Sequence, residues 1–220
     1  MTIKKWLAFY WSAVWRGTVA SLIAGLLLIA LFDDFVLMEM SEPGFNWQTI
    51  YYLVMSGSAI ATLSHAGFFS YLIVRDVFLG ILRSYWVWDR FQLLLVAVVF
   101  EAVAYWRWKV VGDGQPFWEF MILPGVVLAI AIAVAVWKMK LTNRHGFVPT
   151  LFFMFVGTMI EAIPALRYPS LATAIYMLVP LIVCNTWQIM MLPRFSNGGK
   201  SKKSPQTGSS QNSPEGVSVV

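Results

Sequence analysis

The sequence predicts an all-α fold: a polytopic membrane protein built as a six-helix transmembrane bundle with both termini in the cytoplasm. Of its 220 residues, 59% are hydrophobic and 12% are charged, whereas about a quarter of the residues in a soluble domain are charged. Apolar segments of about 20 residues, the length that crosses a bilayer core of roughly 30 Å, recur six times. Basic residues gather in alternate connectors, which indicates the connectors that face the cytoplasm.

The first span, residues 7–32, is too long for a signal peptide, and we expect it to remain as an anchor. Arg16 has two possible placements within it. Either the guanidinium lies about 16 Å deep and needs a buried partner, or residues 6–15 lie along the membrane interface and Arg16 opens the span. The second placement is favoured because a long arginine side chain can reach the interface.

The first span also carries a ladder of small residues, Gly17, Ser21 and Gly25. Small residues at every fourth position let two helices approach closely. The ladder therefore predicts a packing face for another helix, which belongs either to this chain or to a partner protein.

Five more spans follow, at residues 47–74, 86–106, 117–137, 147–166 and 171–192. Each is long enough for a membrane-crossing helix. Tryptophans such as Trp47, Trp86 and Trp137 lie near span ends, as in the aromatic belts of membrane interfaces. Together the six spans predict one transmembrane domain over residues 1–195.

Charge predicts the orientation of the bundle. With a cytoplasmic N-terminus, three of the 16 Lys and Arg residues fall in outer connectors, namely Arg107, Lys109 and Arg167. The positive-inside rule then places both termini in the cytoplasm of a multi-pass plasma-membrane protein. Residues 196–220 lack the apolar surface needed to fold and predict a disordered basic and polar cytoplasmic tail, whose lysines can attract anionic lipid or a protein partner.

Composition argues against several classes of function. The single cysteine, Cys184, excludes an internal disulfide, and two histidines exclude a three-His zinc site. The scattered basic residues do not form a phosphate-binding face, so we expect no nucleic-acid binding. No glycine-rich phosphate loop is present. We therefore expect no enzyme activity and no catalytic, cofactor-binding or metal site. An intramembrane enzyme would need Cys184 or a hydroxyl within hydrogen-bond reach of His65.

Four polar residues inside the spans form a candidate intramembrane polar network, His65, Glu101, Glu161 and Asn185. At 1.5 Å per residue, the two glutamates share a depth of roughly 9 Å below the outer edge. The histidine and the asparagine share a depth of roughly 14–15 Å above the inner edge. The network predicts either a proton, ion or metal site or hydrogen bonds between helices, and small residues on the same helix faces favour the second.

Several sequence runs resemble one family. They are Ser64–Leu72, Gly80–Leu82, Lys138–Met154, Glu161 with Pro164, and Cys184–Asn185. They resemble the KinB-signalling pathway activation proteins of endospore-forming bacteria, and the resemblance covers about residues 1–195. It implies a six-span membrane protein that helps a KinB-like membrane sensor histidine kinase to feed the phosphorelay that starts sporulation. It also implies an accessory or regulator and no kinase activity in this chain.

The leading hypothesis is therefore an accessory protein that binds the membrane region of a sensor kinase. The candidate partner-contact residues lie in one basic turn, at Thr142, Asn143, Arg144, His145 and Pro149. The same residues also suit a purely structural role, because Thr and Asn can bond to nearby backbone and Pro fits a first helical turn. The alternative function is a small transporter or an ion- or proton-responsive membrane protein that uses His65, Glu101 and Glu161.

Overall fold

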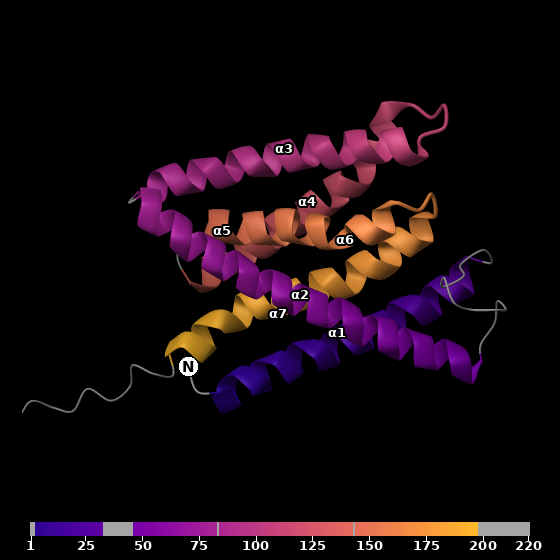
Figure 1. The fold of residues 1–220 in the computed structure, drawn as a ribbon, viewed down its shortest axis with the longest axis horizontal. Coiled ribbons are helices and arrows are strands. Elements are labelled where there is room, and N and C mark those ends of the chain that lie inside the picture. The colour runs from indigo at the N-terminus through magenta and orange to yellow at the C-terminus, as the bar shows by residue number, and fades with distance from the viewer. Residues whose placement is uncertain (1–2, 33–45, 83, 143, 198–220) are drawn as a thin grey trace, which may run out of the picture.

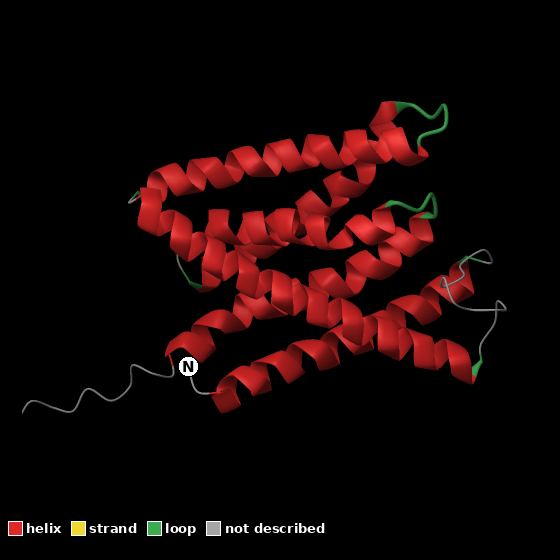
Figure 2. Cartoon of the chain, in the orientation of Figure 1, coloured by secondary structure: helices red, strands yellow, loops and turns green. Residues whose placement is uncertain are grey.

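A computed structural model describes residues 3–32, 46–82, 84–142 and 144–197, the last five of these by their backbone alone. This part of the chain consists of helices joined by short loops (Figure 2), which confirms the predicted all-α class. The long helices are α1 (Ile3–Leu31), α2 (Trp47–Leu82), α3 (Tyr85–Val111), α4 (Phe117–Leu141) and α7 (Leu171–Asn197). Residues 198–220, most of the predicted tail, lie outside the described residues.

The fifth predicted span is a composite rod. It begins with a single 3-10 turn, η1 (Arg144–Gly146), and continues as α5 (Phe147–Phe152). A π-helical turn, η2 (Phe153–Gly157), joins α5 to α6 (Thr158–Leu166). A π-turn inserts an extra residue into a helix and often marks a functional region. Here it rotates the side chains of α6 relative to those of α5.

Five helices in the described part of the chain are long and apolar enough to cross a membrane. They are Ile3–Leu31, Trp47–Leu82, Phe117–Leu141, Arg144–Leu166 and Leu171–Leu192. The third predicted span lies in α3, which is not among these five. Helix α3 carries five charged residues, Asp89, Arg90, Glu101, Arg107 and Lys109. A six-span topology therefore remains a prediction.

The composite rod lies at the centre of the bundle (Figure 1). Helices α1 and α2 pack on each other and on α7, whereas α3 packs mainly on α4 and α5, and α6 packs on α7. Aromatic and aliphatic side chains of η2, such as Phe153 and Phe155, are almost fully buried. Phe68 of α2 meets the Phe153 ring edge to face at a centroid distance of 5.2 Å. Helix α3 forms one edge of the bundle and α1 forms the opposite edge (Figure 1).

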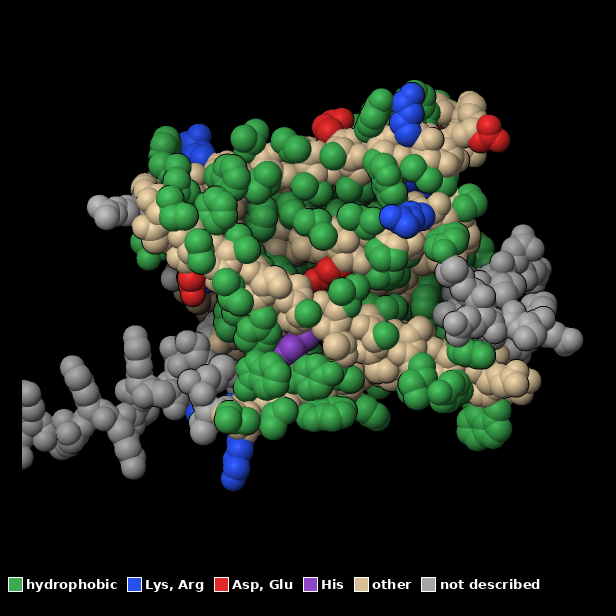
Figure 3. All heavy atoms as spheres, in the orientation of Figure 1, with side chains coloured by type: hydrophobic (Ala, Val, Ile, Leu, Met, Phe, Trp, Pro, Cys, Tyr) green, Lys and Arg blue, Asp and Glu red, His purple; other side chains and the backbone are tan. Residues whose placement is uncertain are grey.

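Basic side chains gather near the ends of the helices, and hydrophobic side chains cover most of the surface between them (Figure 3). Helix α1 runs unbroken through Arg16. The Arg16 guanidinium stacks 3.4 Å from the centroid of the Trp187 ring, and its Nη1 donates a hydrogen bond to the Ser12 carbonyl at 2.8 Å. This cation therefore has partners within the chain.

The small-residue ladder of α1 faces inward. A Cβ atom added to Gly17 would lie 2.5 Å from Cys184 Sγ of α7 and 2.6 Å from Ala61 Cβ of α2. Ser21 is fully buried, and a Cβ on Gly57 of α2 would lie 2.5 Å from Ser21 Cβ. The ladder therefore packs against helices of this chain, which is one of the two possibilities that the sequence left open.

Replacing Gly57 by alanine tests this close approach. We expect Gly57→Ala to lower the free energy of unfolding by about 1–3 kcal/mol, because the new methyl group overlaps Ser21 and approaches the α1 backbone. Gly80→Ala in the same helix is the matched control, since no atom lies within 4 Å of its added Cβ. Unfolding in mixed detergent micelles measures both. Equal effects of the two substitutions would refute the predicted contact.

Candidate functional site

Polar side chains in the interior gather where α2, α6 and α7 meet. The polar cluster consists of Ser64, Thr158, Glu161, Asn185 and Gln188, none of which is more than 7% exposed. Polar groups buried in an apolar bundle need hydrogen-bond partners within the protein, because apolar side chains offer none. The cluster therefore joins these three helices through polar side chains.

Asn185 is the centre of the polar cluster. Its Nδ2 donates hydrogen bonds to Thr158 Oγ1 at 3.0 Å and to Glu161 Oε2 at 3.1 Å. Its Oδ1 accepts a hydrogen bond from Ser64 Oγ at 2.7 Å. Gln188 Nε2 then donates to Ser64 Oγ at 3.1 Å. One amide side chain on α7 thus connects α2 to α6.

Glu161 occupies a space that Gly67 leaves open. A Cβ added to Gly67 would overlap Glu161 Oε1, so any larger residue here would require the carboxyl group to move. Glu161 Oε1 and Gln188 Oε1 are buried and have no hydrogen-bond partner within the described part of the chain. Buried acceptors without partners are uncommon in proteins. The cluster therefore keeps two acceptor positions that a proton or a cation could use.

His65 lies next to Ser64 in sequence but outside the polar cluster. Its ring sits among aromatic side chains of α1 and α2 at centroid distances of 4.8–5.9 Å, namely Trp6, Phe9, Tyr10 and Phe69. Neither ring nitrogen has a hydrogen-bond partner among the described residues. Cys184 Sγ instead donates to the Ala13 carbonyl at 3.6 Å. Among the described residues, neither Cys184 nor a hydroxyl therefore lies within hydrogen-bond reach of His65.

Glu101 lies apart from the other predicted network members, exposed on the outer side of α3. Of the four predicted residues, the structure thus joins Glu161 to Asn185, places His65 in a neighbouring aromatic box and leaves Glu101 outside. Within the described residues, no group of three His, Cys, Asp or Glu side chains is arranged to hold a metal ion.

The basic turn between α4 and α5 is the second candidate region. Thr142 ends α4 and its backbone N–H donates to the Lys138 carbonyl at 3.0 Å. Arg144 and His145 form η1 with exposed side chains. Pro149 occupies the first turn of α5, where its missing N–H costs nothing. Asn143, the remaining predicted contact residue, lies outside the described residues.

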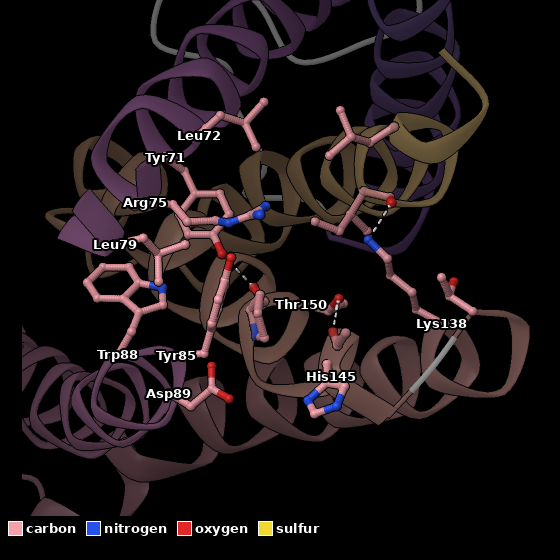
Figure 4. A pocket seen from close by; sticks show the side chains of 15 residues that line it. Tyr71, Leu72, Arg75, Leu79, Tyr85, Trp88, Asp89, Lys138, His145 and Thr150 are labelled. Atoms are coloured by element: carbon pink, nitrogen blue, oxygen red, sulfur yellow. Dashed lines mark hydrogen bonds between the residues drawn. The ribbon is translucent and has the colours of Figure 1, made fainter. Parts of the chain in front are cut away.

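A pocket of about 550 Å³ opens beside this turn, between α2, α3, α4, α5 and α7. Thr142, His145 and Pro149 line it. Charged side chains from three further helices join them, Arg75 from α2, Asp89 from α3 and Lys138 from α4 (Figure 4). Leu79 and Trp88 provide apolar walls. The pocket can therefore hold an apolar side chain beside a charged or polar one.

Hydrogen bonds keep the pocket walls together. Tyr71 Oη donates to the Pro149 carbonyl and accepts from Gln92 Nε2, both at 3.3 Å. Lys138 Nζ donates to the Ile189 carbonyl at 2.8 Å (Figure 4). The sequence places Arg75 and Lys138 among the basic residues of the connectors predicted to face the cytoplasm, but it does not predict that they share a site. The signal that could have predicted a shared site is that both residues lie at the cytoplasmic ends of predicted spans.

Comparison with known proteins identifies one matching family and one similar protein. Residues 17–195 match the KbaA family, described as KinB-signalling pathway activation in sporulation. A KinB-signaling pathway activation protein of Bacillus subtilis (strain 168) is 33% identical over 156 residues, which span 70% of this chain and 79% of that protein. No solved structure matches the chain. The matched family region contains both the polar cluster and the basic turn.

A double-mutant cycle tests the close contact between Gly67 and the Glu161 carboxyl group. We expect Gly67→Ala to lower the free energy of unfolding by about 1–3 kcal/mol, because its methyl group overlaps Glu161 Oε1. In a Glu161→Ala background the same change should cost about 1–2 kcal/mol less, since the overlapping atoms are gone. Gly80→Ala should show no such coupling. Additive effects of Gly67→Ala and Glu161→Ala would contradict the geometry.

Proposed function

Because this chain belongs to the KbaA family of KinB-signalling pathway activation, we propose that it is an integral membrane accessory protein that activates a sensor histidine kinase feeding the sporulation phosphorelay. Its role in KinB pathway activation follows from the family. The direct kinase contact, the plasma-membrane location and the six-span topology are the parts that we add. A regulator with no catalytic chemistry of its own fits this family role.

One observation carries the proposal of a direct contact, namely the pocket beside the basic turn. Three of the five predicted contact residues line it. Charge predicts that this end of the bundle faces the cytoplasm. The segment of a sensor kinase that leaves the membrane would therefore pass at the same level. Such a segment could place an apolar side chain against Leu79 and Trp88 and a charged one near Asp89 or Lys138.

Activation requires unequal binding of two kinase states. A partner that binds both conformations equally shifts neither population, however tightly it binds. We propose that the pocket fits the kinase segment in the signalling conformation and fits the resting conformation less well. A tenfold difference in affinity, worth about 1.4 kcal/mol, changes the ratio of the two states tenfold. A few well-placed contacts in one pocket suffice for a difference of that size.

A second candidate function is an ion- or proton-responsive membrane protein. The unpaired Glu161 Oε1 inside the polar cluster favours it. Glu161→Gln separates the two functions, because it retains the side-chain shape and removes the carboxylate. Loss of a pH or cation response of kinase signalling in this variant would support the second function, and an unchanged response would oppose it.

Photo-crosslinking tests the kinase contact. We expect a photoreactive amino acid at His145 to capture the co-expressed KinB kinase, because this exposed residue lines the pocket. The same amino acid at Arg167 is the control, since Arg167 is exposed at the opposite end of the same rod. Mass spectrometry identifies the captured protein. Failure to capture the kinase from His145, together with normal sporulation after deletion of the gene, would reject the proposal.

Labelling of single cysteines tests the proposed topology. A cysteine at His145 and one at Ser201 should react only after the membrane is permeabilised, whereas a cysteine at Arg167 should react in intact cells. The charge distribution predicts this pattern. The native Cys184 is buried and contributes little background. Labelling of positions 145 and 201 from opposite sides of the membrane would contradict the proposed orientation.

A further inference from the structure

The outer face of α3 presents a carboxylate in an apolar setting. Glu101 is exposed, and so are its neighbours one and two turns away, Leu94, Ala97, Val98 and Tyr105. Leu94 is 60% exposed, Val98 52% and Tyr105 55%. Figure 3 shows an acidic side chain over the middle of α3 with hydrophobic side chains around it. We call these five residues the α3 outer face.

Glu101 lies far from both ends of its helix. Helix α3 begins at Tyr85 and ends at Val111. At 1.5 Å per residue, Glu101 is about 24 Å from the first end and about 15 Å from the second. If α3 crosses the bilayer, as the sequence predicts, this carboxyl group lies within the depth of the hydrocarbon core.

No cation of the described chain neutralises Glu101, which forms no hydrogen bond or ion pair with any described residue. Arg107, six residues further along α3, lies about 120° around the helix and is itself buried. Residues 33–45, the connector predicted on the outer side, contain no Lys or Arg in their sequence. Ionisable residues in membrane spans almost always pair within a protein interior. Here the partner has to come from outside the described chain.

We propose that the α3 outer face binds a membrane-spanning helix of the sensor kinase, and that this helix presents a basic or hydrogen-bond-donating side chain to Glu101. The inference rests on the proposed function and names the surface that the kinase uses. Ala97, one turn before Glu101, is small enough to let the two helix backbones approach closely. A donor on the partner then pairs with the one carboxylate among these five residues.

A second copy of this chain fits the face poorly. Two copies share one orientation in the membrane, so a two-fold axis along the membrane normal would place both Glu101 carboxylates at the same depth. Two facing carboxylates repel each other or must share a proton. A lipid chain offers neither a cation nor a donor at this depth. Charge complementarity therefore selects a different helix.

The α3 outer face and the pocket of the basic turn lie on different sides of the same helix. The first turns of α3 contribute Tyr85, Trp88 and Asp89 to that pocket. At 3.6 residues per turn, these three side chains lie about 120–160° around the helix from Glu101. The α3 outer face is therefore a contact surface separate from the pocket, and Glu101 fixes the position of the kinase helix on it.

Photo-crosslinking from the face tests this inference. A photoreactive amino acid at Val98 should capture the co-expressed KinB kinase, whereas the same amino acid at Val126 should not. Val126 is the matched control because it is 52% exposed, like Val98, but lies on α4. Capture of a second copy of this chain, or of lipid alone, from Val98 would overturn the inference.

Substitutions of Glu101 test the role of its carboxylate. Glu101→Leu and Glu101→Lys should each lower the Val98 capture yield about fivefold, which is the scale of one interhelical hydrogen bond in a membrane, and Glu101→Gln should retain most of it. Yields that do not change in Glu101→Leu and Glu101→Lys would overturn the inference. An unchanged melting temperature in detergent shows that the variants fold.

The His145 crosslink separates this inference from the proposed function. If His145 captures the kinase and Val98 does not, the kinase contact stands and the α3 surface is wrong. If neither position captures the kinase, both proposals fail. If Val98 alone captures it, the α3 surface stands and the pocket contact fails.

Discussion

A polar group inside an apolar bundle has to find its partner within protein, and this constraint shapes the centre of the molecule. Asn185 satisfies it by bonding to Ser64, Thr158 and Glu161, which lie on two other helices. Such bonds form only if the helices come close. Gly67 provides the space for Glu161, and the glycines of α1 and α2 let those helices approach in the same way. Small residues and one amide therefore fix how α2, α6 and α7 meet.

The same constraint distinguishes the buried core, where most polar groups have partners, from the surface sites where polar groups remain available to a partner. The polar cluster is nearly saturated within the described residues, with two acceptor oxygens unpaired. The basic turn and its pocket are different, because Arg75, Asp89, Lys138 and His145 converge on an open cavity from four elements. Helix α3 carries open positions at two places, since its first turns line the pocket and its middle carries an exposed carboxylate. A rigid centre with open polar positions at one end and one edge suits a protein that acts by binding another.

For a signalling accessory, rigidity and openness have complementary roles. Binding can bias a kinase only by the difference between its contacts with two kinase states. A scaffold that deformed to fit both states would lose that difference. The hydrogen bonds from Tyr71 to Pro149 and from Lys138 to Ile189 join the pocket walls. A pocket with fixed walls keeps the difference between its contacts with the two kinase states. The family relationship names the pathway, and the geometry suggests where discrimination between states could occur.

The sequence by itself determined the all-helical class and the approximate positions of the helices, because the length of an apolar run is a local property. The predicted span 117–137, for example, lies within α4, at Phe117–Leu141. The sequence also identified Glu101, Glu161 and Asn185 as polar residues within the predicted spans. Only the tertiary structure decided that Glu161 turns inward to Asn185, that Glu101 turns outward, and that Tyr71 and Arg75 share a pocket with the basic turn. A residue count along a helix gives depth, whereas direction around the axis depends on which helices pack together and on the small residues that set their separation.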